Sequence, residues 1–357
     1  MNNCENFIQK FFKDKKTSDA VLITSFSNRF YLTHFSSSDG FVLATKEEVY
    51  LAVDFRYYEM AKKKVKPPFK VVLVEGRYSE TLKEIVKKHN VSNLWIEDKS
   101  LSISELDFYK KIFPKVQFLY VSAFFETLRS IKTLEELEFI KKAQEITDNA
   151  FSHILNFISD KKTESEVALE LEYFMRKQGA DGIAFDTIAV SGKKSSLPHG
   201  TPSHVLLQKD AFLTMDLGAK YNGYCADMTR TVVLGRANDE MKRVYDTVLN
   251  AQKLALDKIR AGVLGSEVDK GAREYIYSHG YEGCFGHSTG HGLGIDVHEM
   301  PSFSPSYNKI IEKGCVLSVE PGIYIEDKFG VRIEDIVYVT DDGYENLTKS
   351  SKELIEI

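Results

Sequence analysis

The chain has little cysteine, no surplus of positive charge and no long apolar run, and each shortage excludes a class of protein. The cysteines form no CxxC pair and no framework of short spacings, which argues against a disulfide scaffold and a thiolate zinc site and favours a reducing compartment. They are Cys4, Cys225, Cys284 and Cys315. No stretch approaches the roughly 20 apolar residues of a transmembrane helix. We therefore expect a cytoplasmic protein that makes no membrane contact.

Positive charge is balanced by acids along the chain. The formal net charge is -5 at pH 7, and the lysine runs Lys13–Lys16 and Lys62–Lys64 are short enough to be solvated surface. Nucleic-acid binders usually carry a basic surplus, so this composition argues against a nucleic-acid partner. Residues 1–16 lack the apolar core and cleavage site of a signal peptide and have the pattern of an amphipathic helix.

The first third of the chain alternates short apolar runs with helical spacings. β-branched runs between turn residues predict strands at 20–24, 40–45, 48–53 and 70–75. Helical spacing predicts helices at 57–64, 79–89 and 102–112. No catalytic constellation lies here, so residues 1–125 are interpreted as a small α/β domain.

Residues 126–357 mix helices with strand-rich segments, which predicts an α+β domain. Apolar residues recur every three or four positions from Thr133 to Phe157, the pattern of an amphipathic helix. Thr163–Glu166 fits a capping box and predicts the start of a second helix, and a third is expected at 239–260. The domain boundary is placed just before Glu126.

Two carboxylates are predicted to meet on a β-hairpin of the second domain. Asn222-Gly223 is the preferred pair for a two-residue type I′ turn, and the register of that turn puts Asp216 opposite Thr229. Asp227 shares the strand face of Thr229, so Asp216 and Asp227 become diagonal neighbours. In an apolar interior two carboxylates need a cation between them. The alternative is a pair of surface acids on an exposed hairpin.

Three histidines lie within one glycine-rich segment, Gly286–Glu299. They are His287, His291 and His298. Glycines on both sides of His291 let the backbone approach a metal or a substrate closely. A single histidine is more often an ordinary core residue, but three in such a segment indicate a binding site.

Two partial motifs in the same segment are rejected. Gly286–Gly290 matches G-x-S-x-G, but a nucleophile elbow needs a helix after the serine, and the glycine-rich sequence that follows is a poor helix former. His298-Glu299 begins the motif H-E-x-x-H, but Ser302 stands where the second histidine belongs. A serine hydrolase and a zincin are therefore disfavoured.

Two further candidate ligands, Glu320 and Glu334, lie in the segment Cys315–Thr340. Glu320 ends a predicted strand, and Arg332 and Glu334 share a face of a later strand with apolar neighbours. Oxygen-rich ligation with one imidazole suits Mn²⁺, Co²⁺, Fe²⁺ or Zn²⁺. Four buried carboxylates around a single divalent ion would leave a large uncompensated charge, so two ions are predicted.

Several segments resemble, in order and spacing, the family of prolidase, aminopeptidase P and methionine aminopeptidase. They are FDTIAVSGKKSSLPHG (185–200), DLGAKYNGYCADMTRT (216–231), GHSTGHGLGIDVHE (286–299), LSVEPGIYI (317–325) and GVRIEDIVYVT (330–340). The resemblance covers nearly the whole chain. It implies a pita-bread catalytic domain preceded by a smaller, creatinase-like N-terminal domain.

The resemblance also implies a role for each polar residue of these segments. The residues that would bind two divalent metal ions are Asp216, Asp227, His291, Glu320 and Glu334, with Asp227 and Glu334 bridging. His199 and His298 would face the substrate, and His287 and Arg332 would support the ligands. Glu320 would also act as general base and acid. Mn²⁺ is the expected metal, with Co²⁺, Zn²⁺ or Fe²⁺ as alternatives, and a homodimer is implied.

The expected reaction is hydrolysis of the bond before proline in short peptides with proline in second position. A strict dipeptidase must bind the free carboxylate of that proline, for which an arginine fork is the natural device. In many prolidases an arginine follows the His-Glu-x-Pro stretch, but here Met300-Pro301 is followed by Ser302. We therefore favour an Xaa-Pro aminopeptidase, with an Xaa-Pro dipeptidase as the alternative. A non-catalytic binding module is a distant third, because every ligand position is filled.

Overall fold

A six-stranded mixed sheet organises the first part of the chain in the computed structural model, which describes residues 3–357. Its strands are β1 (Asp19–Ile23), β2 (Phe41–Thr45), β3 (Val49–Val53), β4 (Phe69–Leu73), β5 (Asn93–Ile96) and β6 (Gln117–Tyr120). The order across the sheet is β4-β3-β2-β1-β5-β6. The β1–β2 and β2–β3 pairs are antiparallel, and the other pairs are parallel.

Six helices accompany this sheet. They are α1 (Asn3–Phe11), α2 (Phe26–Thr33), α3 (Phe55–Lys64), α4 (Tyr78–Lys88), α5 (Ile103–Ile112) and α6 (Ser122–Ser130). The strands and helices predicted for this part of the chain are confirmed. The helix expected in residues 1–16 is α1, and residues 1–2 lie outside the described residues. Because β5 and β6 have only four residues each, their alternation was too short to predict.

The second unit begins at Ser130, and the first ends at Arg129. The boundary predicted before Glu126 falls inside α6 and stays a prediction. The helices of the second unit are α7 (Leu134–Ile154), α8 (Glu164–Lys177), α9 (Asp239–Leu256) and α10 (Gly265–Ser278). Both predicted helix starts carry a capping box, at Thr133 and at Thr163.

The strands of the second unit form two main sheets. The first has the order β12-β9-β8, from β8 (Ile188–Ser191), β9 (Ala211–Leu217) and β12 (Met228–Leu234). The second has the order β14-β13-β15-β18-β19, from β13 (Gly290–Gly292), β14 (Glu299–Phe303), β15 (Val316–Val319), β18 (Asp335–Val339) and β19 (Tyr344–Asn346). Smaller pairings involve β7 (Gly182–Ile183), β10 (Ala219–Tyr221), β11 (Tyr224–Cys225) and the hairpin of β16 (Gly322–Ile325) and β17 (Phe329–Arg332).

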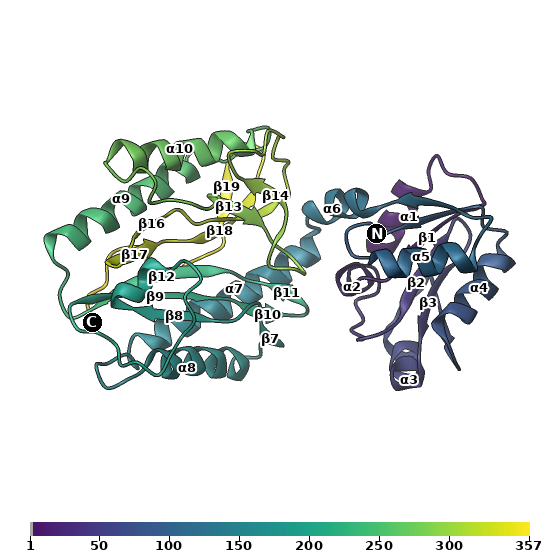
Figure 1. Cartoon of the computed structure of the whole chain (residues 1–357), viewed down its shortest axis with the longest axis horizontal. Helices are drawn as coiled ribbons and strands as arrows, with labels where there is room; N and C mark the ends of the chain where they lie inside the picture. Colours follow the sequence, from purple (N-terminus) through teal and green to yellow (C-terminus); the bar gives the residue numbers. More distant parts are fainter. Residues whose placement is uncertain (1–2) are drawn as a thin grey trace. The chain divides into compact units, whose positions relative to one another are not determined.

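Each main sheet has its own pair of helices. Figure 1 shows α7 and α8 beside β8, β9 and β12, and the apolar side chains between them form one core cluster. α9 and α10 share a second core cluster with the five-stranded sheet and the β16–β17 hairpin. The halves meet where the Glu334 N–H donates to the Thr229 carbonyl at 3.1 Å. This is the predicted α+β pita-bread arrangement.

The predicted hairpin register is confirmed. Asp216 pairs with Thr229 across β9 and β12. Asn222 and Gly223 have φ values of 45° and 79°, and positive φ at both central positions is what a type I′ turn requires. Asp216 therefore lies on β9 and Asp227 directly before the adjoining strand β12, as the turn residues predicted.

Helix α10 was not predicted, because its sequence carries weak helix signals. Its N-cap residue, Leu264, makes no side-chain cap, and Gly271 interrupts its apolar spacing. A Cβ on Gly271 would lie 2.5 Å from Cε of Lys258, the far end of a flexible side chain, whereas the apolar residues Val268, Ala272 and Ile276 of α10 pack in one core with α9. Tertiary packing overrides propensity here.

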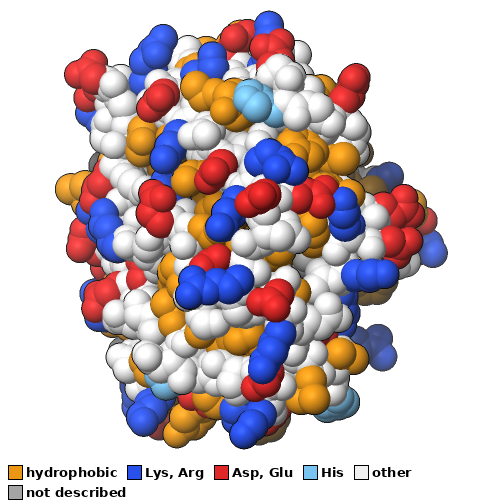
Figure 2. Space-filling view, turned by 90° about the vertical axis from the view of Figure 1, so that its left-hand side faces the viewer, with side chains coloured by type: hydrophobic (Ala, Val, Ile, Leu, Met, Phe, Trp, Pro, Cys, Tyr) orange, Lys and Arg blue, Asp and Glu red, His pale blue; other side chains and the backbone are white. Residues whose placement is uncertain are grey.

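The surface of the described residues carries charges of both signs. Figure 2 shows Lys and Arg side chains interspersed with Asp and Glu over the face that it presents. Among residues 3–357, no helix combines the length and apolar character that crossing a bilayer requires.

Candidate metal centre and active site

A cavity of about 620 Å³ in the second unit gathers every residue that the sequence predicted for the site. The acids and histidines that line it include Asp216, Asp227, His291, Glu320, Glu334, His199, His287 and His298. Arg332 and Ser302 line it as well. The structure therefore brings together side chains from segments that are far apart in the sequence.

Both halves of the unit contribute to this cluster. Asp216 lies on β9, and Asp227 directly precedes β12. His291 lies on β13, Glu320 follows β15, and Glu334 precedes β18. Strand ends hold side chains on rigid elements while leaving them open to a cavity, which is where precise ligand geometry is easiest to maintain.

Three of these side chains form a group that could hold a metal ion. One ligand atom from each of Asp227, His291 and Glu334 lies within 4.8 Å of the others. His291 Nε2 also lies 3.1 Å from Glu320 Oε1 and 3.7 Å from Asp227 Oδ2. Carboxylate oxygens around one imidazole nitrogen are a donor set for a divalent first-row metal.

The electrostatics of the cluster call for a cation. Burial, followed by the charges of neighbouring carboxylates, raises the pKa of Asp227 and of Glu334 well above the ordinary range. Burial also raises the pKa of Asp216, although the Arg332 guanidinium counteracts it. Burial acts in the same direction on Glu320, but the hydrogen bond and charge of His291 lower its pKa overall. Without bound cations, ionising all these acids together is costly.

Two buried oxygens in the cluster have no partner. Asp216 Oδ1 and Glu334 Oε1 are buried, and neither accepts a hydrogen bond. A buried carboxylate oxygen without a partner is expensive unless a ligand satisfies it. Together with the donor set, these oxygens fit divalent metal ions bound at this site. The assignment of each ligand residue stays a prediction.

Hydrogen bonds hold the ligand-type side chains in place. The Thr229 hydroxyl donates to Glu334 Oε2 at 2.8 Å. The Ser318 hydroxyl accepts from the His291 N–H and donates to Glu320 Oε1, both at 3.0 Å. His291 Nδ1 lies 3.2 Å from the Gly292 carbonyl, so Nδ1–H donates there and Nε2 is the nitrogen aimed at the cluster.

A chain of hydrogen bonds runs behind the cluster. Arg332 Nη2 donates to Asp216 Oδ2 at 2.7 Å, and Nη1 donates to the Tyr324 hydroxyl at 2.8 Å. That hydroxyl lies 2.9 Å from His287 Nε2, and His287 Nδ1 lies 2.9 Å from the Ser288 carbonyl. Because a carbonyl only accepts, Nδ1 carries the His287 proton and Tyr324 donates to Nε2. Burial lowers the pKa of His287, which favours this neutral form.

The two predicted substrate-facing histidines stand apart from this chain. His298 packs edge-on against His291, with ring centroids 4.3 Å apart. Burial and the charge of His291 lower the pKa of His298, so its ring is neutral near pH 7 and one ring nitrogen can donate. His199 lies on the same cavity, in the loop after the short 3₁₀ helix η1 (Gly192–Ser196).

Sequence reasoning missed Tyr324 and Ser318. Tyr324 lies opposite Gly330 on the β16–β17 hairpin, two pairs along from Arg332 and Gly322. The sequence signal for Tyr324 is the short interval between β16 and β17. Such an interval predicts a hairpin, and a hairpin places Tyr324 near Arg332. Ser318 lies two residues before Glu320 and so shares its strand face.

The rejected serine motif is also explained by the structure. Ser288 lines the cavity, but β13 follows it at Gly290 in place of the helix that a nucleophile elbow needs. A serine nucleophile therefore lacks its structural context.

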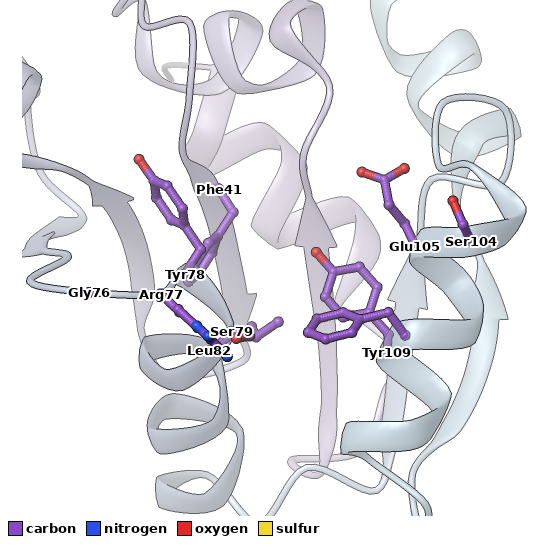
Figure 3. A pocket seen from close by; sticks show the side chains of 10 residues that line it. Phe41, Gly76, Arg77, Tyr78, Ser79, Leu82, Ser104, Glu105 and Tyr109 are labelled. Atoms are coloured by element: carbon purple, nitrogen blue, oxygen red, sulfur yellow. The ribbon is translucent and has the colours of Figure 1, made fainter.

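A second cavity, of about 490 Å³, lies in the first unit. Figure 3 shows Phe41 and Tyr78 on one of its sides and Tyr109 on the other. Its carboxylate, Glu105, accepts from the Ser102 N–H at 2.8 Å in the capping box of α5. The described residues that line it include no histidine or cysteine, so the candidate metal-ligand cluster lies in the cavity of the second unit.

Family models match both units of the chain. The model of metallopeptidase family M24 matches residues 138–341. The model of the creatinase/prolidase N-terminal domain matches residues 7–131. Together the matched ranges include every residue of the candidate site.

Individual relatives are similar over nearly the full length. The solved structure of an Xaa-Pro dipeptidase from Bacillus anthracis has a TM-score of 0.94 and 40% identity, covering 100% of both chains. An X-Pro aminopeptidase structure from Thermotoga maritima has a TM-score of 0.90 and 37% identity, covering 95% of this chain and 97% of that one. An Xaa-Pro dipeptidase of Pyrococcus furiosus is 39% identical over 345 residues, 96% of this chain and 97% of the relative.

Proposed function

The chain belongs to metallopeptidase family M24, and we propose that it is an Xaa-Pro aminopeptidase, which removes the N-terminal residue from peptides with proline in second position. Relatives whose names specify dipeptidase or aminopeptidase activity on Xaa-Pro bonds support the coarser statement that it is a metal-dependent Xaa-Pro peptidase. Those names divide between the two activities, so the choice rests on the residues of the cavity.

The choice of an aminopeptidase over a dipeptidase rests on Arg332, whose hydrogen-bond donors are already engaged. Arg332 is the one Lys or Arg among the described residues that line the cavity. Its donors are engaged by Thr229 Oγ1, Asp216 Oδ2, the Tyr324 hydroxyl and the Pro198 carbonyl. A guanidinium committed in this way has no fork left for the carboxylate of a C-terminal proline.

Ser302 supports the same choice. It pairs with His291 across β13 and β14, and its hydroxyl donates to the Gly290 carbonyl at 3.1 Å. It lines the cavity with a short neutral side chain, where many prolidases of the resemblance carry an arginine. A cavity without a free cationic side chain lacks a group that would select substrates whose chain ends at proline.

The metal ions are proposed to be held by the acids and the imidazole of the cluster. The proposed ligands are Asp216, Asp227, His291, Glu320 and Glu334. When bound, divalent ions there would polarise the scissile carbonyl and lower the pKa of water toward neutrality. Two ions balance the four carboxylates better than one. Mn²⁺ is proposed because the donors are mostly hard carboxylate oxygens.

Glu320 is proposed to move the proton of the reaction. Its carboxylate lines the cavity with Oε1 3.1 Å from His291 Nε2, so it lies where it can accept a proton from the attacking water. The same carboxyl then delivers that proton to the departing nitrogen as the carbon–nitrogen bond breaks. A proline nitrogen in a peptide bond carries no hydrogen, so this delivery is required for it to leave as a secondary amine.

His199 and His298 are proposed to orient the substrate carbonyl. A neutral imidazole donates one N–H, and such a donor stabilises the negative charge that develops on the carbonyl oxygen. The proline ring is recognised by shape, since its nitrogen offers no donor. Apolar side chains on the cavity wall, including Phe185, Ile188 and Val297, offer surfaces for such a ring.

The direct test compares a dipeptide with a tripeptide. The value of kcat/KM is measured for Ala-Pro and Ala-Pro-Ala with protein carrying the same amount of Mn²⁺. An Xaa-Pro aminopeptidase cleaves the tripeptide at least as well as the dipeptide. Cleavage of Ala-Pro alone would mean that the protein is an Xaa-Pro dipeptidase and that the carboxylate is bound by a group outside this cavity.

The resemblance further supports a homodimer, which we include in the proposal. Light scattering coupled to gel filtration measures the mass directly. A mass near twice the 40.6 kDa of the chain is expected, and a monomer that retains full activity would contradict the dimer.

A further inference from the structure

We propose that Arg230, which does not line the cavity, is a positioning residue for the metal centre: it fixes the backbone of Glu334 against the segment Lys349–Lys352. The inference rests on the proposed function only in taking Glu334 as a metal ligand. Arg230 is a buried cation that has no part in the proposed reaction, and its role would be structural.

Arg230 is buried, with 1% of its surface exposed, on the strand that also carries Thr229. Neighbouring residues of a strand point to opposite faces. The Thr229 hydroxyl contacts the carboxylate of Glu334, so the Arg230 side chain leaves the strand on the other face. A buried guanidinium requires partners for all its donors.

Each of the five N–H donors of Arg230 has an acceptor of its own. Nε donates to the Ser351 carbonyl at 2.9 Å. Nη1 donates to the Thr229 carbonyl at 2.9 Å and to the Glu334 carbonyl. Nη2 donates to the Ser350 carbonyl at 2.9 Å and to Asp335 Oδ1 at 2.7 Å. The side chain therefore joins three separate segments of the chain.

Glu334 is the residue that these contacts surround. Its N–H donates to the Thr229 carbonyl at 3.1 Å, and its own carbonyl accepts from Arg230. Its Oε2 accepts from the Thr229 hydroxyl, which leaves Oε1, buried and without a hydrogen-bond partner, as the oxygen available to a metal ion. With both backbone groups and one carboxylate oxygen fixed, the position of the remaining oxygen is determined before any metal arrives.

The segment Lys349–Lys352, against which Arg230 holds Glu334, is itself held in place. Asp148 on α7 anchors it, accepting from the Ser350 N–H at 2.8 Å and from the Lys349 N–H at 3.0 Å. Lys352 Nζ donates to Asp335 Oδ2 at 2.7 Å. Asp335 is thereby shared between two cations, Arg230 and Lys352. One end of the segment is held by Asp148 and the other by Asp335, the residue that follows Glu334.

Lysine cannot replace this arginine. An ammonium on a flexible stem has three donors that radiate from one atom, whereas the acceptors here surround a planar fork. Arg230→Lys keeps the buried positive charge opposite Asp335 and removes the geometry. It therefore separates positioning from charge balance.

The test measures metal affinity, which needs no peptide substrate. Chelated protein is titrated with Mn²⁺ by calorimetry, and kcat is measured as a function of free Mn²⁺. Arg230→Lys should weaken the binding of at least one Mn²⁺ by about 10- to 100-fold, the usual effect of losing a group that orients a ligand. Its kcat should rise toward the wild-type value when Mn²⁺ is saturating.

Two further variants separate positioning from stability. Asp148→Asn replaces one of the two oxygens that hold Lys349 and Ser350 and does not touch Glu334, so it should weaken Mn²⁺ binding in the same direction but less. Ile276→Val truncates the core of the same unit, so it should lower the melting temperature and leave Mn²⁺ affinity unchanged.

Folded Arg230→Lys with wild-type Mn²⁺ affinity would overturn the inference. If that variant does not fold, unchanged Mn²⁺ affinity in Asp148→Asn overturns it instead. Failure of the wild-type protein to bind Mn²⁺ or a related divalent ion is a different result, since it would refute the proposed function.

Discussion

Ser302→Arg should convert the substrate preference of the cavity toward dipeptides. Ser302 lies on β14 opposite His291 and lines the cavity, so an arginine there brings a free guanidinium to the substrate. Arg332 would stay engaged with its present partners and would not compete. The new side chain can form a bidentate pair with the carboxylate of Ala-Pro, which Ala-Pro-Ala does not present at that position.

The size of the effect follows from the type of bond gained. A hydrogen bond to a charged group contributes about 1.5–3 kcal/mol. At about 1.4 kcal/mol per factor of ten, the ratio of kcat/KM for Ala-Pro over Ala-Pro-Ala should rise roughly 10- to 100-fold. The lost hydrogen bond from Ser302 to the Gly290 carbonyl affects both substrates equally, so it cancels from the ratio.

The assay compares the two peptides on each variant at equal Mn²⁺ content. Ser302→Met matches the added bulk without the charge and should leave the ratio near that of the wild-type protein. Ser302→Lys adds the charge without the fork and should give an intermediate ratio. Equal ratios in Ser302→Arg and Ser302→Met would refute the claim that a missing cation at this position permits longer substrates.

Four other results are expected. His291→Ala should lose metal, whereas His199→Ala and His298→Ala should keep it and lose about 10²-fold in kcat, as measured by elemental analysis and kinetics. Metal loss in His298→Ala alone would mean that His298, and not His291, is the metal ligand. Chelation should abolish hydrolysis and Mn²⁺ or Co²⁺ should restore it, so full activity in metal-free protein would exclude the proposed chemistry. Tyr324→Phe removes the link between His287 and Arg332, and loss of a buried hydrogen-bond partner should lower stability by about 1–3 kcal/mol in denaturant unfolding; a change within error would mean that water replaces the hydroxyl. Burial raises the pKa of Asp227 and Glu334, so these two groups bind more protons in the folded chelated protein than in the unfolded chain, and the stability that they contribute is lost as pH rises above about 4. The melting temperature of the chelated protein should therefore fall relative to that of the Mn²⁺-loaded protein over this pH range.

The elements that the sequence predicted are those governed by local rules. Asn222-Gly223 dictates a turn whose register puts Asp216 opposite Thr229, and the structure has that pairing. The capping box at Thr163 likewise marks the start of α8. In both cases the residues that determine the structure lie within a few positions of it.

The parts that escaped prediction depend on contacts between distant segments. Helix α10 has a weak start in the sequence, but its apolar side chains pack with those of α9 in one core. Tyr324 matters because a hairpin brings it to Arg332 and the fold brings His287 to both. In the sequence, Arg230 is one basic residue of a predicted strand, and nothing local indicates its role. That role depends on the fold, which places Glu334 and Ser350 beside it.

The division of the ligand-type residues between two halves has a consequence for how the protein is made. Thr229, next to the hairpin acids, and Glu334 are 105 residues apart. At the usual rate of about 5–20 residues per second, a ribosome needs roughly 5–20 s to cover that interval. During this time the nascent chain already carries Asp216 and Asp227, His291 and Glu320 are added in turn, and Glu334 comes last. The full set of proposed ligands therefore exists only after translation has passed Glu334, so we expect the proposed metal ions to bind after the two halves have closed.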